Sequence, residues 1–392
     1  MTLGTVGGNA AGLRLARLSL TDFRSYHGLT WRPRGRMHLL FGPNGSGKTN
    51  LLEAVSLLVP GRGLRGARVA DLPRRGAPVW AVAGRFETPD GPMDIGTGSA
   101  PDGRGEGRGE RRAFRLDGAA PRSQAEVATR VAAVWLTPQM DRLFQEAAGG
   151  RRRFLDRLVY ALEPGHAREV AAHDTAMAGR NRLLAEGRGD AAWLAGLEDS
   201  MARHAVAATA ARMGLAARLN AAPPAGGFPA ARMALECPIA ARLETEPALA
   251  VEDWLRAELA AGRGGDAAAG SARVGAHRSD MRLEDAESGL PAALASTGQQ
   301  KALLIGVVLA HAALLAEARG FAPLLLLDEP AVHLDAGRRA ALFAALAGLP
   351  AQVFITGTDS EPFRPLAGLA EGLRAGGGEL AADPDFPPPA GT

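Results

Sequence analysis

The chain has 392 residues, which is enough for two or three domains and a large buried core. Its 46% apolar and 22% charged residues are typical of a soluble globular protein, and a formal charge of +3 is too small to indicate a particular partner. The single cysteine, Cys237, excludes an intrachain disulfide and favours a reducing cytoplasm. No targeting or membrane-spanning segment is predicted, because Arg14 and Arg17 interrupt the N-terminal apolar stretch and the longest apolar run, 302–316, is too short and contains His311.

The two ends of the chain have little capacity to pack. Residues 1–10 are small and uncharged, residues 376–392 are rich in Gly, Ala and Pro, and both are predicted to be disordered tails. Segments with the composition of strands follow the first tail at 13–20, 79–86 and 111–116. Residues 91–109 are predicted to be a glycine-rich connection.

Residues 42–49 match the phosphate-loop pattern G-x-x-x-x-G-K-[ST]. The apolar run 37–41 predicts a buried strand before the loop, and 50–58 predicts the helix after it. The loop therefore lies at a helix N-terminus, where free backbone N–H groups and the positive end of the helix dipole favour phosphate. The predicted ATP-binding residues are Gly42, Pro43, Asn44, Gly45, Ser46, Gly47, Lys48, Thr49 and Asn50.

Lys48 and Lys301 are the only lysines among 45 basic residues. Each therefore marks a place where a compact ammonium is favoured over a planar guanidinium. Lys48 is expected to reach the β- and γ-phosphates of a nucleotide, and the hydroxyl of Thr49 is expected to bind Mg²⁺. The sequence thus predicts a nucleotide-binding protein.

Arginines form two local clusters. The first consists of Arg104, Arg108, Arg111, Arg112 and Arg115, and the second is the run 151–153. Either cluster is able to contact a polyphosphate backbone, and Arg111 and Arg112 are the candidate DNA-binding residues. The alternative for each cluster is an ordinary solvated surface.

Residues 151–262 differ in character from the segments on either side. Ala, Leu, Arg and Glu dominate at helical spacing, with one interruption at Pro223-Pro224, which predicts a helical insertion that splits an α/β domain. The Gly- and Ala-rich stretch 262–270 is expected to lead back to the α/β part. The predicted domains are a head of 11–150 plus 270–375 and a helical arm of 151–269.

The apolar run 324–327 is followed by Asp328, Glu329 and Pro330. Such a run predicts a fully buried parallel strand, and ligands bind at the carboxyl ends of these strands in open α/β sheets. Asp328 is expected to hold Mg²⁺, directly or through water, and Glu329 is expected to polarise the attacking water.

A short motif precedes the long apolar helix predicted at 302–316. It consists of Ser296, Thr297, Gly298, Gln299, Gln300 and Lys301. The motif is similar to the signature of ABC-type ATPases, whose Ser and Gly bind the γ-phosphate held by a second subunit. A Ser-Thr-Gly sequence is also a common helix cap. Lys301 is either an ion-pair residue of this helix or of unassigned role, and no catalytic role is predicted for it.

Taken together in this order, these motifs resemble the RecF family of bacterial recombinational-repair ATPases, which are related to the heads of chromosome-maintenance and double-strand-break-repair ATPases. The resemblance covers most of residues 13–366. It rests on the segments 20–26, 42–49, 136–139, 151–156, 275–280, 296–301, 328–330, 333–335 and 356–358. The resemblance implies an α/β fold, an ABC-type P-loop ATPase head with an inserted helical arm domain.

The resemblance also implies roles for single residues. Gln139 matches the Q-loop position that senses Mg²⁺ and the γ-phosphate, with a surface-turn glutamine as the alternative. Asp335 matches the D-loop acid that communicates across an ATP-bridged dimer, with a helix cap as the alternative. Two departures stand out, because Thr356-Gly357-Thr358 lacks the switch histidine of transporter ATPases and Ala276 replaces the usual proline before His277-Arg278. His277 and Arg278 either contact DNA or the other lobe of the protein, or they have only a structural role.

The implied function is an ATP-dependent clamp on double-stranded DNA near single-strand gaps and junctions. The resemblance implies that the protein binds ATP and Mg²⁺ and dimerises head to head with two nucleotides sandwiched. It also implies slow ATP hydrolysis with stimulation by DNA, and cooperation with RecR in loading the RecA recombinase. The first alternative is the nucleotide-binding subunit of an ABC transporter, in which Q-loop and signature are close, whereas Gln139 and Ser296 are 157 residues apart. The second alternative is a GTPase, which would need the lysine of a guanine-specific N-K-x-D motif, and neither lysine lies in such a motif. The third is a DNA-binding module in which the nucleotide is only structural, and Glu329 argues against it because such a module would not need it.

Overall fold

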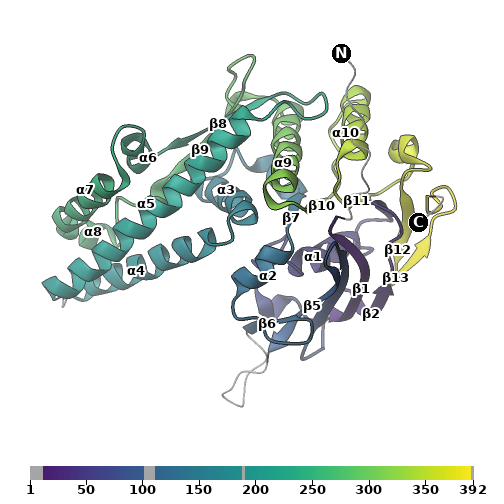
Figure 1. Cartoon of the computed structure of the whole chain (residues 1–392), viewed down its shortest axis with the longest axis horizontal. Helices are drawn as coiled ribbons and strands as arrows, with labels where there is room; N and C mark the ends of the chain where they lie inside the picture. The colour runs from purple at the N-terminus through teal and green to yellow at the C-terminus, as the bar shows by residue number, and fades with distance from the viewer. Residues whose placement is uncertain (1–11, 101–110, 188–189, 390–392) are drawn as a thin grey trace. The chain divides into compact units, whose positions relative to one another are not determined.

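The computed structural model describes residues 12–100, 111–187 and 190–389, and the chain divides into two compact units (Figure 1). The first unit comprises residues 1–138 and 312–392, and the second comprises residues 139–311. The second unit is therefore inserted in the sequence of the first. Residues 1–10, predicted to be a tail, and the arginines at 104 and 108 lie outside the described residues.

The first unit contains an antiparallel five-stranded sheet with the order β2-β1-β4-β5-β6. In β4, the buried residues Val82, Gly84 and Phe86 alternate with exposed ones, so one face of the sheet packs on the core. The strands are β1 (Arg14–Phe23), β2 (Tyr26–Trp31), β4 (Ala81–Thr88), β5 (Gly91–Ala100) and β6 (Arg111–Leu116).

The second sheet of this unit has six strands in the order β13-β12-β3-β11-β10-β7, and all neighbours except β12 and β13 are parallel. The strands are β3 (Met37–Phe41), β7 (Ala133–Leu136), β10 (Leu324–Leu327), β11 (Val353–Gly357), β12 (Glu371–Gly376) and β13 (Glu379–Ala382). Every residue of β3, β7, β10 and β11 is buried, which explains their continuous apolar sequences. Their carboxyl ends meet at one edge of the sheet.

Helix α1 (Lys48–Leu57) packs on β1 and β4 of the first sheet and on β11 of the second. It is therefore covered by both sheets, and eight of its ten residues are buried. In the part of this unit that the structure describes, the other α-helices that lie entirely within it are the short α2 (Gln124–Arg130) and α10 (Ala336–Gly348).

The second unit is mainly helical. Its elements are α3 (Ala148–Leu162), α4 (His166–Glu186), α5 (Ala191–Ala221), β8 (Ala231–Glu236), α6 (Pro238–Leu243), α7 (Ala248–Ala261), α8 (Arg263–Ala269) and β9 (Asp280–Asp285). A core of small and aliphatic residues, including Met201, Ala205 and Leu255, joins α5 to α7. Arg180 of α4 is fully buried beside it and pairs with Glu198 and Asp266.

Helix α9 (Thr297–Arg319) begins in the second unit and ends in the first. It is long and apolar enough to span a bilayer, but 72% of its most apolar window is buried inside the structure. The prediction of a buried helix at 302–316 is thereby confirmed. The predicted strands at 37–41 and 324–327 are also confirmed, as β3 and β10.

One glycine-rich segment forms regular structure, contrary to prediction. Residues 91–100 of the predicted connection 91–109 form β5, because Met93, Ile95 and Thr97 alternate into the core. The stretch 262–270, which is expected to lead back to the α/β part, contains α8, where Asp266 is buried and bonded to Arg180 and Arg273.

The predicted C-terminal tail is folded over much of its length. Strand β13 pairs antiparallel with β12, and Phe386 is buried with its ring 5.4 Å from that of Phe41. The helical region also contains one unpredicted strand, β8, which pairs with β9.

The observed units divide at 138/139 and 311/312, whereas the sequence places its boundaries at 150/151 and 269/270. The difference arises because residues that follow 270 belong to the helical unit by their contacts. Strand β9 pairs with β8, and Arg151 forms a two-pronged ion pair with Asp280 at 2.7 Å.

Candidate nucleotide-binding site

The phosphate loop connects β3 to α1 at the carboxyl edge of the parallel sheet. Gly42, Gly45 and Gly47 have φ angles of 144°, 83° and 105°, in the region that favours glycine. A Cβ atom on Gly42 would lie 2.6 Å from the carbonyl oxygen of Ala375, and one on Gly47 would lie 2.8 Å from Tyr26 Oη. Both the backbone conformation and the lack of space therefore require glycine at positions 42 and 47.

Lys48 is buried, and its ammonium closes on the loop. Nζ donates to the carbonyl oxygens of Gly42 at 2.6 Å and Pro43 at 3.0 Å. Ser46 Oγ is also buried and has no hydrogen-bond partner among the described residues. The hollow at this position is lined by Asn44, Gly45, Ser46, Gly47, Lys48, Thr49, Asn50, Arg65 and Glu329. An ammonium, an unpaired hydroxyl and a helix N-terminus in one hollow fit a phosphate group.

Asp328 follows β10 directly, and its carboxylate joins three segments of the chain. Oδ1 accepts hydrogen bonds from Thr49 Oγ1 at 3.0 Å and from Thr356 Oγ1 at 2.7 Å. The backbone N–H of Glu329 donates to the same Thr356 oxygen at 2.9 Å. A carboxylate and a hydroxyl side by side supply the oxygen ligands that Mg²⁺ prefers, so these residues fit the predicted metal site.

Thr356 belongs to the segment 356–358, which lacks a switch histidine, and its side chain has a structural role. Its hydroxyl is fully buried and links Asp328 to the backbone of Glu329. Glu329 itself has a φ of 50°, which is uncommon for a residue with a side chain. Strained residues of this kind gather at functional sites, and Glu329 lines the hollow beside Lys48.

Arg65 also lines this hollow, although no sequence motif assigned it a role. Its Nη1 donates to Asn50 Oδ1 at 2.8 Å and lies 3.6 Å from Glu53 Oε2. The only sequence signal for Arg65 is its place in an arginine-rich segment directly after the phosphate-loop helix, and such a segment has several other interpretations.

The signature residues form the N-terminus of α9. The backbone N–H of Ser296 donates to Gln299 Oε1 at 2.9 Å, and the backbone N–H of Gln299 donates to Ser296 Oγ at 3.4 Å. This reciprocal pair is a capping box, and it leaves Ser296 exposed. Lys301, by contrast, is buried and forms an ion pair with Asp141 at 3.4 Å, which confirms the ion-pair alternative.

Two other residues predicted to act at the nucleotide site, Gln139 and Asp335, lie outside the phosphate loop. Gln139 is exposed in a short 3₁₀ helix (Pro138–Arg142), and it belongs with Ser296 to the second unit. Asp335 belongs to the first unit and caps α10, because its Oδ1 accepts from the backbone N–H of Arg338 at 2.8 Å. The structure therefore brings together the phosphate loop, Asp328 and Glu329 within the first unit.

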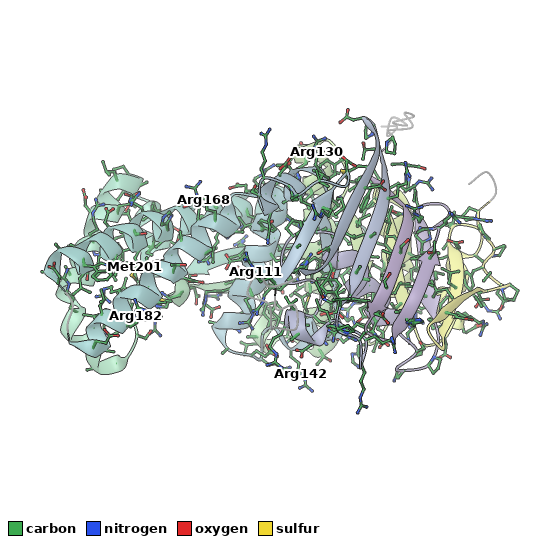
Figure 2. All side chains as sticks on the ribbon, turned by 90° about the horizontal axis from the view of Figure 1, so that it is seen from below. Arg111, Arg130, Arg142, Arg168, Arg182 and Met201 are labelled. Atoms are coloured by element: carbon green, nitrogen blue, oxygen red, sulfur yellow. The ribbon has the colours of Figure 1, made fainter. Side chains whose placement is uncertain are left out.

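The arginine clusters separate into exposed and engaged residues. In the first cluster, Arg111 is exposed. Four arginines outside both clusters are exposed as well, namely Arg130, Arg142, Arg168 and Arg182 (Figure 2). Arg112 instead donates to the carbonyl oxygens of Leu57, Val59 and Gly61 at the end of α1. The guanidinium of Arg112 is thus already engaged within the first unit, and Arg111 is the better candidate for DNA.

Other arginines proposed as phosphate contacts also have structural partners. In the run 151–153, Arg151 pairs with Asp280 and Arg152 donates to the carbonyl oxygen of Ser279 at 2.8 Å, so both connect α3 to the region of β9.

His277 and Arg278 both contact the carbonyl oxygen of Ala272. These contacts favour the structural alternative for that pair.

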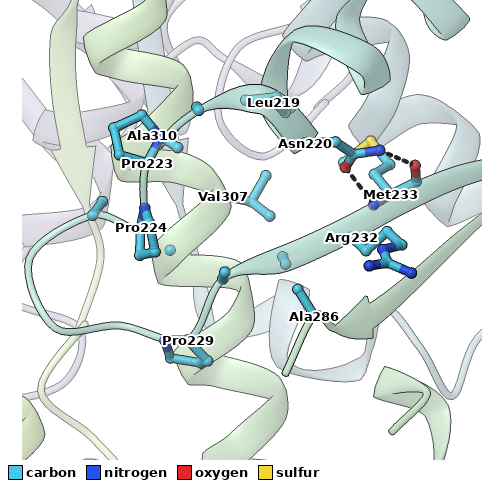
Figure 3. Close-up of a pocket in the computed structure, with 15 residues that line it drawn as sticks. Leu219, Asn220, Pro223, Pro224, Pro229, Arg232, Met233, Ala286, Val307 and Ala310 are labelled. Carbon is cyan, nitrogen blue, oxygen red and sulfur yellow. Dashed lines mark hydrogen bonds between the residues drawn. The ribbon is translucent and has the colours of Figure 1, made fainter. Parts of the chain in front are cut away.

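A second hollow lies in the helical unit between α5, β8 and α9 (Figure 3). Its walls are mainly apolar, with Pro223, Pro224 and Val307 among them. Asn220 crosses one side and makes two 2.8 Å hydrogen bonds to the backbone of Met233. Arg232 brings a positive charge to this lining, but the described residues around the hollow include no carboxylate and no phosphate-loop motif, so they do not match the predicted nucleotide site.

A phosphate loop after one strand of a parallel sheet, with an acidic pair after a nearby parallel strand, defines a P-loop nucleotide-binding domain. The sequence model of the family described as RecF/RecN/SMC N terminal domain matches residues 14–369. A protein of Mesorhizobium japonicum named "DNA replication and repair protein RecF" is 46% identical over 96% of this chain and 99% of its own length. A protein of the same name from Allorhizobium ampelinum is 45% identical over 93% of this chain and 98% of its own length. The chain belongs to the RecF family of DNA replication and repair proteins.

Solved structures agree on the fold. The structure of the "recombination mediator protein RecF-ATPrS in RecFOR pathway" matches with a TM-score of 0.81 and 21% identity, over 95% of this chain and 99% of the other. An Smc head domain of Pyrococcus furiosus, bound to the C-terminal domain of ScpA, matches with a TM-score of 0.51 and 15% identity over 95% of this chain and 96% of the other. The predicted fold class, an ABC-type P-loop ATPase head with a helical insertion, is confirmed.

Proposed function

We propose that this chain is an ATP-hydrolysing DNA clamp of recombinational repair. In this proposal ATP and Mg²⁺ bind at the phosphate loop, and two copies dimerise head to head on double-stranded DNA near single-strand gaps. Slow, DNA-stimulated hydrolysis then releases the clamp. The single observation that carries the proposal is the contact of Thr49 with Asp328, which joins the phosphate loop to the acidic strand.

ATP is the proposed nucleotide on two grounds. The buried ammonium of Lys48 and the unpaired Ser46 hydroxyl suit a polyphosphate. A solved structure that is similar in fold is described as RecF-ATP. We propose that triphosphate oxygens replace the carbonyl oxygens of Gly42 and Pro43 as the partners of Lys48 Nζ.

Thr49 and Asp328 would hold Mg²⁺, and the metal would neutralise charge on the phosphates when bound. Glu329 is the proposed general base. It would accept a proton from a water molecule as the water oxygen bonds to the γ-phosphorus, while the bond from that phosphorus to the β-phosphate oxygen breaks and ADP leaves. The position of Glu329 beside Lys48 in the hollow supports this role.

The exposed capping box of Ser296 and Gln299 supports a role for the signature in dimerisation. We propose that Ser296, Thr297, Gly298 and Gln299 complete the nucleotide site of a second copy, with Asp335 as the D-loop residue at the same interface. Because the described hydrogen bonds of the phosphate loop lie within the first unit, one copy would bind ATP before it dimerises.

DNA is proposed to bind through its phosphates, without base reading, and Arg111 is the candidate contact. RecR is the proposed protein partner, in the loading of a recombinase at gaps, and the cytoplasm is the proposed location. Full-length relatives named as repair proteins support this assignment over a transporter subunit.

The proposal is tested by phosphate release from ATP with and without duplex DNA that contains a single-strand gap. Wild-type protein should release phosphate slowly and faster with DNA, and Lys48→Met should abolish release under both conditions. Release that DNA does not change would contradict the clamp, and release that survives Lys48→Met would point to a contaminating ATPase.

A further inference from the structure

The turn between β1 and β2 lies directly against the phosphate loop. Tyr26 is fully buried, and its Oη donates to the carbonyl oxygen of Gly47 at 3.1 Å. Burial raises the pKa of the Tyr26 hydroxyl to about 12, so this group remains a donor at any working pH. A Cβ atom on Gly47 would lie 2.8 Å from Tyr26 Oη and 3.0 Å from Ser25 Oγ, so no space separates turn from loop.

The contact fixes the peptide group that joins Gly47 to Lys48. The C=O and N–H of a trans peptide point in opposite directions. Because the Gly47 carbonyl is directed at Tyr26, the N–H of Lys48 is directed to the opposite side, away from the turn. The same carbonyl also accepts from the backbone N–H of Leu51 at 3.0 Å, so both of its lone pairs are used. Tyr26 thereby aligns one of the free N–H groups with which a helix N-terminus binds phosphate.

Two further contacts hold the turn on helix α1. Ser25 Oγ accepts from Asn50 Nδ2 at 2.9 Å. Arg24 Nε and Nη2 each donate to the carboxylate of Glu53 at 2.8 Å, and the side chain of Glu53 is fully buried. These bonds hold the turn in a fixed position on the phosphate-loop helix.

The backbone of the turn is strained where it makes these contacts. Asp22 and Arg24 have φ angles of 44° and 53°, in the left-handed region that residues with side chains seldom adopt. The backbone N–H of Arg24 donates to the carbonyl oxygen of Leu72 at 3.0 Å, and the carbonyl oxygen of Asp22 accepts from the N–H of Arg74 at 2.6 Å. Strain persists only where surrounding contacts determine the conformation, so the shape of this turn is fixed from both sides.

We infer that Tyr26 is a positioning residue for nucleotide binding, which acts by holding the Gly47–Lys48 peptide in the orientation that presents its N–H to phosphate. This inference rests on the proposed binding of ATP. One hydrogen bond of this kind corresponds to about a two- to tenfold change in an equilibrium constant. Removal of the hydroxyl alone should therefore weaken binding of the polyphosphate by about that factor.

The test compares Tyr26→Phe with a matched control in the full-length chain. Thr88→Val is the control, because Thr88 Oγ1 donates to the carbonyl oxygen of Gly91 at 2.8 Å in the β4–β5 turn of the same unit. The thermal midpoint and the dissociation constants of ATP and of inorganic tripolyphosphate are measured for both variants. Tyr26→Phe should weaken ATP and tripolyphosphate by the same factor, and Thr88→Val should leave both affinities at the wild-type value even where its midpoint falls equally.

Equal ATP affinity of wild type and Tyr26→Phe would overturn the inference alone, as would an equal loss of affinity in Thr88→Val, which would indicate general destabilisation. A wild-type chain that does not bind ATP would overturn the proposed function and the inference with it. Ser25→Ala supplies a second variant, since loss of its bond to Asn50 should weaken tripolyphosphate in the same direction; an unchanged affinity there together with unchanged affinity in Tyr26→Phe would exclude the turn from nucleotide binding.

Discussion

Thr49 donates a hydrogen bond to Asp328 over 3.0 Å, although 279 residues separate them in the sequence. The contact exists because β3 and β10 both pair with β11 in parallel, so the segments that follow them meet at one edge of the sheet. Thr356, at the carboxyl end of β11, donates to the same carboxylate from between them. The helical unit enters the sequence between these strands without disturbing the edge that holds the phosphate site.

Lys48→Arg should impair nucleotide binding although it retains the positive charge. Nζ of Lys48 fits between two loop carbonyl oxygens at 2.6 and 3.0 Å, and a planar guanidinium is too large for that position. We expect weaker ATP binding, or bound ATP that is not hydrolysed, as measured by calorimetric titration and phosphate release. Wild-type affinity and turnover in this variant would argue against the phosphate loop as the nucleotide site.

Glu329→Gln should bind ATP and DNA but hydrolyse ATP about 10²- to 10⁴-fold more slowly, because an amide cannot accept the proton of the attacking water. The ATP-bound dimer should consequently persist. Single-turnover phosphate release measures the effect, and Glu361→Gln is a suitable control because Glu361 is a surface residue that pairs with Arg364. Turnover at the wild-type rate in Glu329→Gln would remove Glu329 from the role of base.

Arg111→Ala and Arg112→Ala should have different consequences. The exposed Arg111 is expected to contribute to DNA binding, so its loss should reduce the dependence of DNA affinity on salt by about one counterion. Loss of Arg112 removes a charged donor from the carbonyl groups at the end of α1 and should lower the free energy of unfolding by about 1.5–3 kcal/mol. Salt titrations and chemical denaturation separate the two effects. An unchanged salt slope in Arg111→Ala would return this residue to ordinary solvated surface.

Stability should fall in mild acid partly through His311. Burial lowers the pKa of His311 to about 3, while its Nε2 bonds to the carbonyl oxygen of Leu158 at 2.9 Å. Below a pH of about 6.5 the unfolded chain binds a proton that folded His311 does not, so the stability present above that pH is lost, by up to about 1.4 kcal/mol per pH unit. His311→Gln retains a donor without this titration, and its free energy of unfolding should vary less between pH 6.5 and 5. An identical pH dependence in both proteins would contradict this assignment.

The sequence alone was sufficient to predict features that a short local pattern determines. The glycines and Lys48 of the phosphate loop, the apolar strand β3 and the Asp328-Glu329 pair all follow from short motifs with a physical reason for each residue. The family resemblance, rather than any local pattern, supplied Gln139 and Asp335.

Features that depend on tertiary contacts were not predictable in the same way. Strand β5 lies in a glycine-rich segment whose strand character comes from pairing with β4 and β6. Arg112 is predicted to contact DNA, with a solvated surface as the alternative, because nothing in its neighbourhood in the sequence reveals the carbonyl groups at the end of α1. The C-terminal segment lacks any periodicity, and it folds because Phe386 packs against Phe41. Tyr26 lies in one of the segments that carry the family resemblance. Its bond to Gly47, 21 residues away, nevertheless depends on how the β1–β2 turn packs against the phosphate loop.

In the proposed dimer, the signature of one copy completes the nucleotide site of the other. Ser296 is exposed at the N-terminus of α9, whereas every described contact of the phosphate loop lies in the other unit. Ser296→Arg should therefore retain ATP binding by the single chain but prevent a second copy from approaching. Ser123→Arg is the matched control, because Ser123 is an exposed helix cap of α2 with the same type of bond.

The deciding measurement is the molar mass in solution by light scattering, with and without ATP, for the wild type and both variants. ATP should double the mass of the wild type and of Ser123→Arg and should leave Ser296→Arg at the mass of one chain, with ATP still bound. A Ser296→Arg protein that doubles its mass on ATP as the wild type does would contradict the shared site and favour a nucleotide site complete within one chain.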